Sequence, residues 1–144
     1  MTRIVVDTSA ILALFDEAYA EHAAIAGIVT SDPGPFAVSP MIVAEADYML
    51  FTRLGAAAAR RFAADVASEA YELAEWSARD HAAAVDVSNH YGDDKDYIGM
   101  ADASNVVLAD RYGTTRLLSL DQRHFRKLLP LRGGSHFTLL PYDA

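Results

Sequence analysis

The stretch IVVDTSAILAL, residues 4–14, decides the fold, because a short apolar run leads directly into a helical segment. Ile4–Val6 is rich in β-branched residues and is typical of a short buried strand. Asp7 or Thr8 can cap a helix that passes through residues 11–14. A strand followed at once by a helix is the opening of a β–α unit, so we expect an α/β protein.

The same alternation continues along the chain. Strands are predicted at 36–38, 71–73, 117–120 and 137–140, and helices at 17–29, 41–54 and 56–69, with two further helices ending at Gly92 and Gly113. Ser39 and Pro40 form a cap followed by proline at the first helical position, and Gly55 is a natural end for that helix. Strands that alternate with helices favour an α/β sandwich with a mostly parallel central sheet flanked by helices.

The bulk composition describes one ordered globule. A chain of 144 residues with 52% hydrophobic content fits a single domain, residues 1–144. It has no cysteine, which excludes disulfides and thiolate metal sites and fits a reducing compartment. No apolar run approaches the ~20 residues of a membrane span, and the N-terminal residues lack a signal-peptide layout. We therefore expect a cytoplasmic protein without membrane association.

Charge is distributed unevenly. The net charge is −8, which by itself argues against non-specific binding to nucleic acid and suggests a basic partner. Half of the 12 basic residues nevertheless lie between positions 111 and 132, where Asp121 is the only acid. These residues are Arg111, Arg116, Arg123, Arg126, Lys127 and Arg132. The run is either a solvated face or a rim that steers phosphates toward an acidic site.

Two carboxylates follow predicted strands. Asp7 comes directly after residues 4–6, and Asp121 after residues 117–120. Ligands of open parallel sheets bind beyond the carboxyl ends of the strands, so these two acids are candidates for one shared site. The alternative is that each simply caps the following helix.

Two other carboxylates lie within predicted helices. Glu45 has apolar residues three and four positions away on both sides, so burial there would be costly without a partner, and Asp47 has similar neighbours. Asp102 is about two turns into its helix if Asp96 is the cap, which is too far for the helix dipole to account for it. Exposure to solvent is the alternative for both Glu45 and Asp102. Asp96 is kept only as a contributor at the outside of the site.

If Asp7, Glu45, Asp102 and Asp121 meet, they need a proton or a cation between them. Two unit charges about 4 Å apart repel by ~4 kcal/mol at an effective dielectric near 20. Oxygen ligands favour Mg²⁺ or Mn²⁺ over Zn²⁺. The five histidines show no metal-ligand spacing, and we expect them to be surface residues or local hydrogen-bonding groups. They are His22, His81, His90, His124 and His136.

Four motifs in order carry a resemblance to a known family. IVVDTSA at 4–10, VAEADYML at 43–50, GMADAS at 99–104 and LSLDQRHF at 118–125 cover almost the whole chain. At these residues the sequence resembles the PIN-domain ribonucleases, specifically the VapC toxins of type II toxin–antitoxin systems. The resemblance implies a PIN-like sandwich and a Mg²⁺-dependent endoribonuclease that cleaves structured RNA such as tRNA or rRNA.

The resemblance also assigns roles to the acids. Asp7 and Asp102 would be the principal metal ligands, and Glu45 and Asp121 would complete a catalytic acidic pocket. Glu45 occupies the family's acidic position in the second motif, which selects it over Asp47.

Further expectations concern neighbours and partners. Thr8 and Ser119 would be supporting hydroxyls beside the acids. The family further implies a homodimer and a cognate antitoxin, expected to be basic, whose tail enters the site region. Candidates for contacts to RNA phosphates are Arg116, Arg123, Arg126 and Lys127.

Three rival functions follow from the same residues. A phosphatase of the haloacid-dehalogenase type needs a second Asp two positions after its nucleophile, and Ser9 stands there. A PIN-type nuclease could act in RNA processing outside toxin–antitoxin systems. A non-catalytic binding module could use the acids only to dock a basic partner. RNA cleavage and peptide binding would separate these alternatives.

Overall fold

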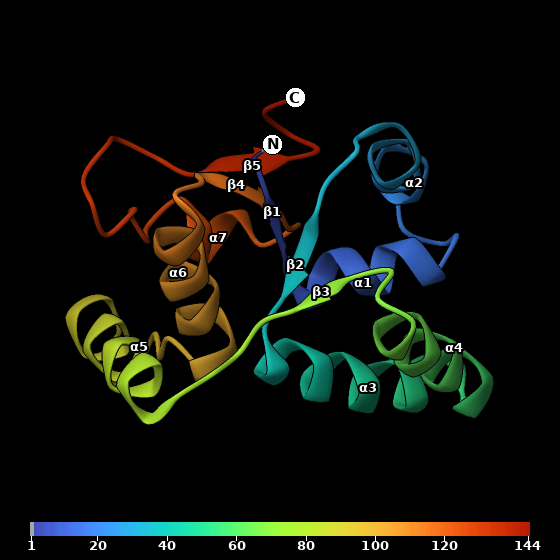
Figure 1. Ribbon diagram of the computed structural model, residues 1–144, viewed down its shortest axis with the longest axis horizontal. Helices are drawn as coiled ribbons and strands as arrows, with labels where there is room; N and C mark the ends of the chain where they lie inside the picture. The colour runs from blue at the N-terminus through green and yellow to red at the C-terminus, as the bar shows by residue number, and fades with distance from the viewer. Residues whose placement is uncertain (1) are drawn as a thin grey trace.

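A five-stranded sheet forms the centre of the molecule (Figure 1). The structure, a computed structural model, describes residues 2–144. The strand order is β3-β2-β1-β4-β5, and every neighbouring pair is parallel. The strands are β1 (Ile4–Val6), β2 (Phe36–Val38), β3 (Glu72–Leu73), β4 (Arg116–Leu118) and β5 (Thr138–Leu140). The predicted α/β class with a parallel sheet is confirmed.

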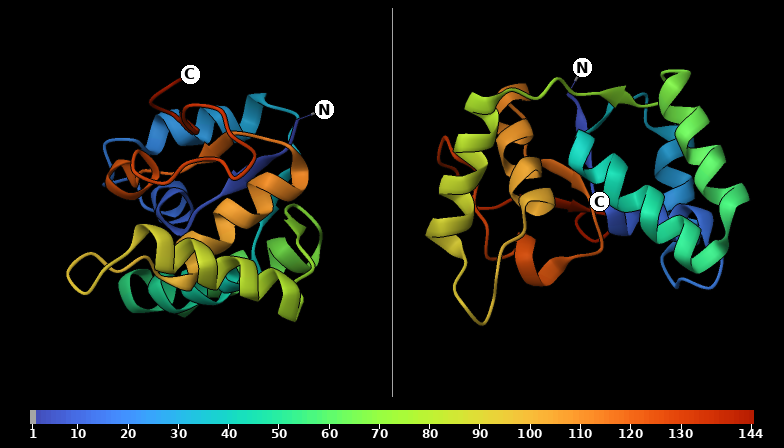
Figure 2. Two further views of the ribbon diagram at one scale, coloured as in Figure 1. Left: turned by 90° about the vertical axis from the view of Figure 1, so that its left-hand side faces the viewer. Right: turned by 90° about the horizontal axis from the view of Figure 1, so that it is seen from below.

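Helices flank the sheet on both sides (Figures 1 and 2). They are α1 (Thr8–Phe15), α2 (His22–Ser31), α3 (Pro40–Leu54), α4 (Ala56–Ala67), α5 (Ala78–Tyr91), α6 (Met100–Tyr112) and α7 (Gln122–Phe125). Helices α1 to α4 contribute to one apolar core, and α5 to α7 to a second core on the other side. The molecule is therefore a three-layer sandwich.

Alternation of side chains along the strands produces these two cores. Val6 and Leu118 belong to the core of α1 to α4, whereas Val5 and Leu117 belong to the core of α5 to α7. Successive side chains of a strand point to opposite faces, so a strand covered on both faces must be apolar throughout. This is why residues 4–6 form a continuous apolar run.

Capping residues in the sequence mark several helix ends that the structure contains. The Ser39 side chain accepts the backbone N–H of Met41 at 3.1 Å, with Pro40 at the first helical position of α3. Gly55 ends that helix with φ of 97°, a conformation that favours glycine. Ser77 and Asp80 form the reciprocal capping box at the start of α5.

The start of α6 differs from the prediction. Asp96 does not cap this helix, which begins at Met100 after Gly99, so Asp102 lies in its first turn. The backbone N–H groups of Lys95 and Asp96 donate to the Asp93 carboxylate at 2.8 and 2.7 Å, which forms a separate turn. The helix dipole favours an acid in the first turn, so the argument that it could not account for Asp102 was wrong.

Other elements differ as well. Helix α2 begins at His22 instead of residue 17, β4 ends at Leu118 instead of residue 120, and α7 was not among the predicted helices, although the capping alternative for Asp121 implies one there. No helix within residues 2–144 has both the length and the apolar character needed to cross a membrane.

The topology places a crevice between β1 and β4. From β1 the chain builds outward to β2 and β3 on one side, and β4 and β5 lie on the other. Ligands of open α/β sheets bind where the strand order reverses, at the carboxyl ends. Asp7 and Ser119 directly follow the two strands at this point.

Candidate metal centre

A pocket of about 330 Å³ lies at this switch point and contains all four predicted carboxylates. They come from the β1–α1 junction, α3, α6 and the segment after β4. The pocket is lined by Asp7, Thr8, Ser9, Leu12, Tyr19, Glu45, Met49, Arg53, Asp102, Asp121 and His124. The fold thus brings together acids that are up to 114 positions apart, the separation of Asp7 and Asp121.

Asp7 is the most enclosed of the four, with 4% of its surface exposed. Its carboxylate accepts hydrogen bonds from Ser9 Oγ at 2.8 Å, Ser119 Oγ at 2.9 Å and Asn105 Nδ2 at 3.2 Å. Burial raises the pKa of Asp7, while the two serine hydroxyls act against that rise. Asp7 occupies the N-cap position of α1 but makes no side-chain capping bond, so the capping interpretation was wrong for this residue.

Asp102 and Asp121 share a basic neighbour, His124. The imidazole Nδ1 lies 2.9 Å from Asp102 Oδ2 and 3.1 Å from Asp121 Oδ2. Burial, together with the charges of Asp7 and Asp121, raises the pKa of Asp102 to about 7. Burial acts to lower the pKa of His124, but its hydrogen bond to Asp96 and the nearby carboxylates outweigh this and raise it.

Sequence reasoning missed His124, which was expected to be an ordinary surface or local hydrogen-bonding residue. One atom each of Asp102, Asp121 and His124 lies within 4.8 Å of the others, a spacing that could hold a metal ion. The available signal was the position of His124 three residues after Asp121 in a short helix, where both side chains face the same way. Asp121 itself caps α7 by accepting the His124 backbone N–H at 3.1 Å.

Glu45 lines the pocket from α3 but is exposed. Of the two alternatives left open for Glu45, exposure to solvent is the one that the structure has, so its carboxylate keeps contact with water. Asp47, its competitor in the sequence, is also exposed but does not line this pocket.

A pair of buried hydroxyls links the start of α3 to α6. Ser104 Oγ donates to Ser39 Oγ at 2.8 Å, and both residues are fully buried. Ser39 caps α3, which carries Glu45, and Ser104 lies two positions after Asp102 in α6. This contact ties together the two helices that supply acids to the pocket.

The basic run between positions 111 and 132 is not a free cationic rim. Each of its six residues forms an ion pair with an acid that folding brings from elsewhere in the chain. The pairs are Arg111–Asp80, Arg116–Asp32, Arg123–Asp96, Arg126–Asp143, Lys127–Asp96 and Arg132–Asp110. Local sequence could not reveal these partners, so the picture of cations surrounding one lone carboxylate is corrected.

The four phosphate-contact candidates lie in different places. Arg116 is the first residue of β4, so it lies at the amino ends of the strands, whereas the pocket lies at their carboxyl ends. Its side chain bonds Asp32 at 2.8 Å. Arg126 makes a two-pronged bond to Asp143 at 2.7 and 2.8 Å. Arg123 and Lys127 lie next to the pocket, in and just after the short helix that carries His124.

Asp96 connects Arg123 and Lys127 to the pocket. Its carboxylate lies 3.1 Å from His124 Nε2 and accepts Arg123 at 2.9 Å and Lys127 at 3.2 Å. The hydrogen bonds from His124 and Lys127 lower the pKa of Asp96. Asp96 therefore holds the far side of the imidazole and orients its other nitrogen toward Asp102.

The donor set suits a hard divalent cation. Four carboxylates converge, and burial and mutual repulsion already raise the pKa of Asp102 and Asp7. Thr8 Oγ1 and Asn105 Oδ1 are buried oxygens without a hydrogen-bond partner within residues 2–144. Oxygen ligands of this kind fit Mg²⁺ or Mn²⁺.

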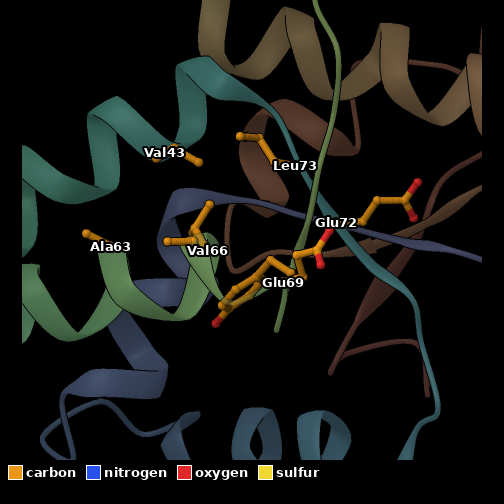
Figure 3. A pocket seen from close by; sticks show the side chains of 8 residues that line it. Val43, Ala63, Val66, Glu69, Glu72 and Leu73 are labelled. Carbon is orange, nitrogen blue, oxygen red and sulfur yellow. The ribbon is translucent and has the colours of Figure 1, made fainter.

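A larger hollow of about 840 Å³ lies elsewhere, between α3, α4 and β3. Val43 on α3, Val66 on α4 and Leu73 on β3 surround it (Figure 3). None of the four site carboxylates lines this hollow. Size alone would therefore point to the wrong place, and the chemistry of the side chains identifies the smaller pocket.

Comparisons with known proteins all match this chain to PIN-domain or VapC proteins. The family model of the PIN domain matches residues 4–128. The chain is 44% identical over 138 residues to Ribonuclease VapC26 of Mycobacterium tuberculosis, which covers 96% of this chain and 100% of the relative. The crystal structure of M. tuberculosis VapC20, described as a sarcin-ricin loop cleaving toxin, superposes with a TM-score of 0.74 at 24% identity. That match covers 82% of this chain and 89% of VapC20.

Proposed function

The chain belongs to the PIN-domain family, and from this premise we propose that it is a metal-dependent endoribonuclease, a toxin of the VapC type. The observation that carries the proposal is the convergence of four carboxylates, from separate elements, in one pocket at the topological switch point. The ribonuclease name of a relative with 44% identity supports the reaction class. We also take residues 1–144 as one PIN-like domain, because β5 completes the sheet beyond the matched region.

Asp7, Asp102, Glu45 and Asp121 would hold Mg²⁺, or Mn²⁺ in its place. A bound ion of this kind supplies Lewis-acid stabilisation of phosphate charge and lowers the pKa of a coordinated water. Burial in a site with raised carboxylate pKa values makes the affinity for a divalent cation depend on loss of protons.

The protein's own contribution is orientation. Ser9 and Ser119 donate to one oxygen of the Asp7 carboxylate and Asn105 donates to the other, and Thr8 offers a hydroxyl in the same pocket. Such supporting hydrogen bonds hold ligand oxygens in place before a cation arrives. His124 does the same for Asp102 and Asp121, with Asp96 behind it.

The proposed substrate is structured RNA, either tRNA or rRNA. Hydrolysis of a phosphodiester in such a site would leave 5′-phosphate and 3′-hydroxyl ends. Arg123, which is 73% exposed at its side chain, and Lys127 remain the candidates for phosphate contacts near the pocket. Arg116 and Arg126 are less suited, because carboxylates away from the pocket already bind them.

The proposed partners are a cognate basic antitoxin and a second copy of this chain. The net charge of −8 favours docking of a basic segment, and a cationic side chain reaching the four acids would compete with the metal and with RNA.

Cleavage of purified RNA tests the proposal. Wild-type protein should cut bulk tRNA or rRNA when Mg²⁺ or Mn²⁺ is added, should stop on chelation, and should lose activity on Asp7→Asn or Asp102→Asn. Intact cleavage by both variants would remove the metal-site assignment. Tight binding of a basic peptide without any RNA cleavage would favour a non-catalytic acidic binding module. Cleavage without any growth inhibition on expression would favour an RNA-processing nuclease.

A further inference from the structure

One cation stands on the wall of the acidic pocket, at the end of α3. Glu45, Met49 and Arg53 are spaced four residues apart, and all three line the pocket. Residues four apart in a helix share a face, so α3 presents a stripe that begins with an acid and ends with a guanidinium. Eight residues of helix separate Glu45 from Arg53 by about 12 Å.

The guanidinium of Arg53 is held by a neutral group. Its Nη1 donates to Tyr19 Oη at 2.8 Å, and Tyr19, from the segment between α1 and α2, lines the same pocket. Across residues 2–144, Arg53 forms no ion pair with a carboxylate. Its positive charge is therefore oriented but not neutralised, in contrast to the six paired residues of the 111–132 run.

An unpaired, oriented guanidinium beside a cluster of acids can bind a phosphate group. Arg53 is exposed, so its fork of N–H groups can reach a ligand from solvent. A guanidinium binds a phosphate through two parallel hydrogen bonds, and a phenol that fixes its orientation reduces the freedom lost on binding. The four carboxylates repel a polyanion, and a free cation at the other end of the pocket offsets that repulsion.

We propose that Arg53, oriented by Tyr19, binds an RNA phosphate next to the one that is cut and thereby positions the strand. The inference rests on the proposed ribonuclease function and adds a residue to it. The rise of ~12 Å along α3 sets Glu45 and Arg53 at different points of the pocket wall, and no ion pair within residues 2–144 joins Arg53 to a site acid, so the guanidinium is assigned to a phosphate other than the one that is cut. Arg53 is accordingly a positioning residue, and its removal should affect substrate binding more than turnover.

The matched variants are Arg53→Gln, Arg53→Lys, Tyr19→Phe and the control Arg60→Gln. Arg60 is an exposed arginine of α4 that does not line the pocket. For cleavage of bulk tRNA and rRNA, Arg53→Gln should raise KM at least about 10-fold, because at least one of the two charge-assisted hydrogen bonds is lost, with little change in kcat. Arg53→Lys should recover only part of the loss, because it keeps the charge but not the two-pronged fork. Tyr19→Phe should lie between wild type and Arg53→Gln, and Arg60→Gln should match wild type.

A second measurement is independent of turnover. Binding of fluorescently labelled bulk tRNA is titrated with Ca²⁺ in place of Mg²⁺ at several salt concentrations. Arg53→Gln should reduce the slope of log affinity against log salt by about one phosphate contact, roughly 0.7 to 0.9. The Mg²⁺ concentration that gives half of the maximal thermal stabilisation should not change in Arg53→Gln.

The outcomes separate the two proposals. If wild type cuts RNA and Arg53→Gln behaves like Arg60→Gln in KM and salt slope, the inference is overturned and the ribonuclease proposal stands. If wild type cuts nothing but Arg53→Gln still lowers the salt slope, the phosphate contact stands and the nuclease proposal falls. A fall in kcat with a shifted Mg²⁺ midpoint would place Arg53 in the metal site and reject the positioning role. A wild type that neither cuts nor binds RNA rejects both.

Discussion

The imidazole of His124 bonds the carboxylate of Asp102 at 2.9 Å, although the two residues lie 22 positions apart in different helices. The same ring nitrogen lies 3.1 Å from Asp121. A basic side chain between two acids relieves part of their repulsion, and protons on Asp102 and Asp7 relieve more, since burial raises the pKa of both. The metal-free pocket is thus stabilised by protons that a divalent cation would have to displace.

The first prediction concerns pH and stability without metal. Asp102, with a pKa of about 7 against the ordinary 3.8, and Asp7 bind protons in the folded state that the unfolded chain releases. His124, with a raised pKa, contributes stability below about pH 6.5 that is lost as pH rises. All three act in one direction, so the melting temperature in chelator should fall between pH 5 and pH 8.

Asp102→Asn should flatten this pH dependence, because the amide does not titrate. Acids with lowered pKa values, such as Asp143 at about 2, act only below about pH 4 and lie outside the window. Differential scanning calorimetry across the range provides the measurement. A melting temperature that rose from pH 5 to pH 8 would contradict the assigned proton uptake.

The second prediction concerns Mg²⁺ and the same linkage. Stabilisation by the metal should be larger at pH 8 than at pH 6, because the carboxylates must lose protons to bind it. At 100 times the dissociation constant the gain is about 2.7 kcal/mol. For a domain of this size that corresponds to roughly 5 to 11 °C in melting temperature. Equal shifts at both pH values would argue against Asp102 as a ligand.

The third prediction separates Glu45 from Asp47. Both are exposed acids of α3 two positions apart, but only Glu45 lines the pocket. Glu45→Gln should weaken Mg²⁺ binding and reduce RNA cleavage by about 10-fold or more, since one ligand charge is lost. Asp47→Asn serves as the matched control and should retain both properties. Comparable losses in the two variants would point to overall surface charge as the cause.

The fourth prediction concerns the support of Asp7. Ser119 Oγ donates to the Asp7 carboxylate at 2.9 Å and accepts the Asp121 backbone N–H at 3.0 Å. Ser119→Ala should lower metal affinity or activity by about 10- to 100-fold, as expected when a hydrogen bond to a ligand is removed. Ser68→Ala, at an exposed serine that ends α4, is the control. Unchanged Mg²⁺ titration of Ser119→Ala would show that Asp7 needs no such support.

Local sequence was sufficient for much of the fold. The apolar run at 4–6, the cap at Ser39 with Pro40, and the stop at Gly55 depend on neighbours within a few residues, and the structure has all of them. Short-range steric and hydrogen-bond preferences decide such features. The prediction that Asp96 caps α6 was wrong. An aspartate in this loop does accept backbone N–H groups, but it is Asp93, which closes a separate turn before the helix begins.

For the site, the sequence determined which acids to consider, because each follows a strand or occupies a family motif. Only the tertiary structure decided which groups share a pocket. It placed His124 and Arg53 in the pocket wall and put Arg116 at the other end of the strands, paired with Asp32. It also supplied an acidic partner for every cation of the 111–132 run. These ion pairs join residues that lie far apart in the sequence, so they depend on the strand order and on how the helices pack. The residues next to a charge in the sequence therefore cannot reveal its partner.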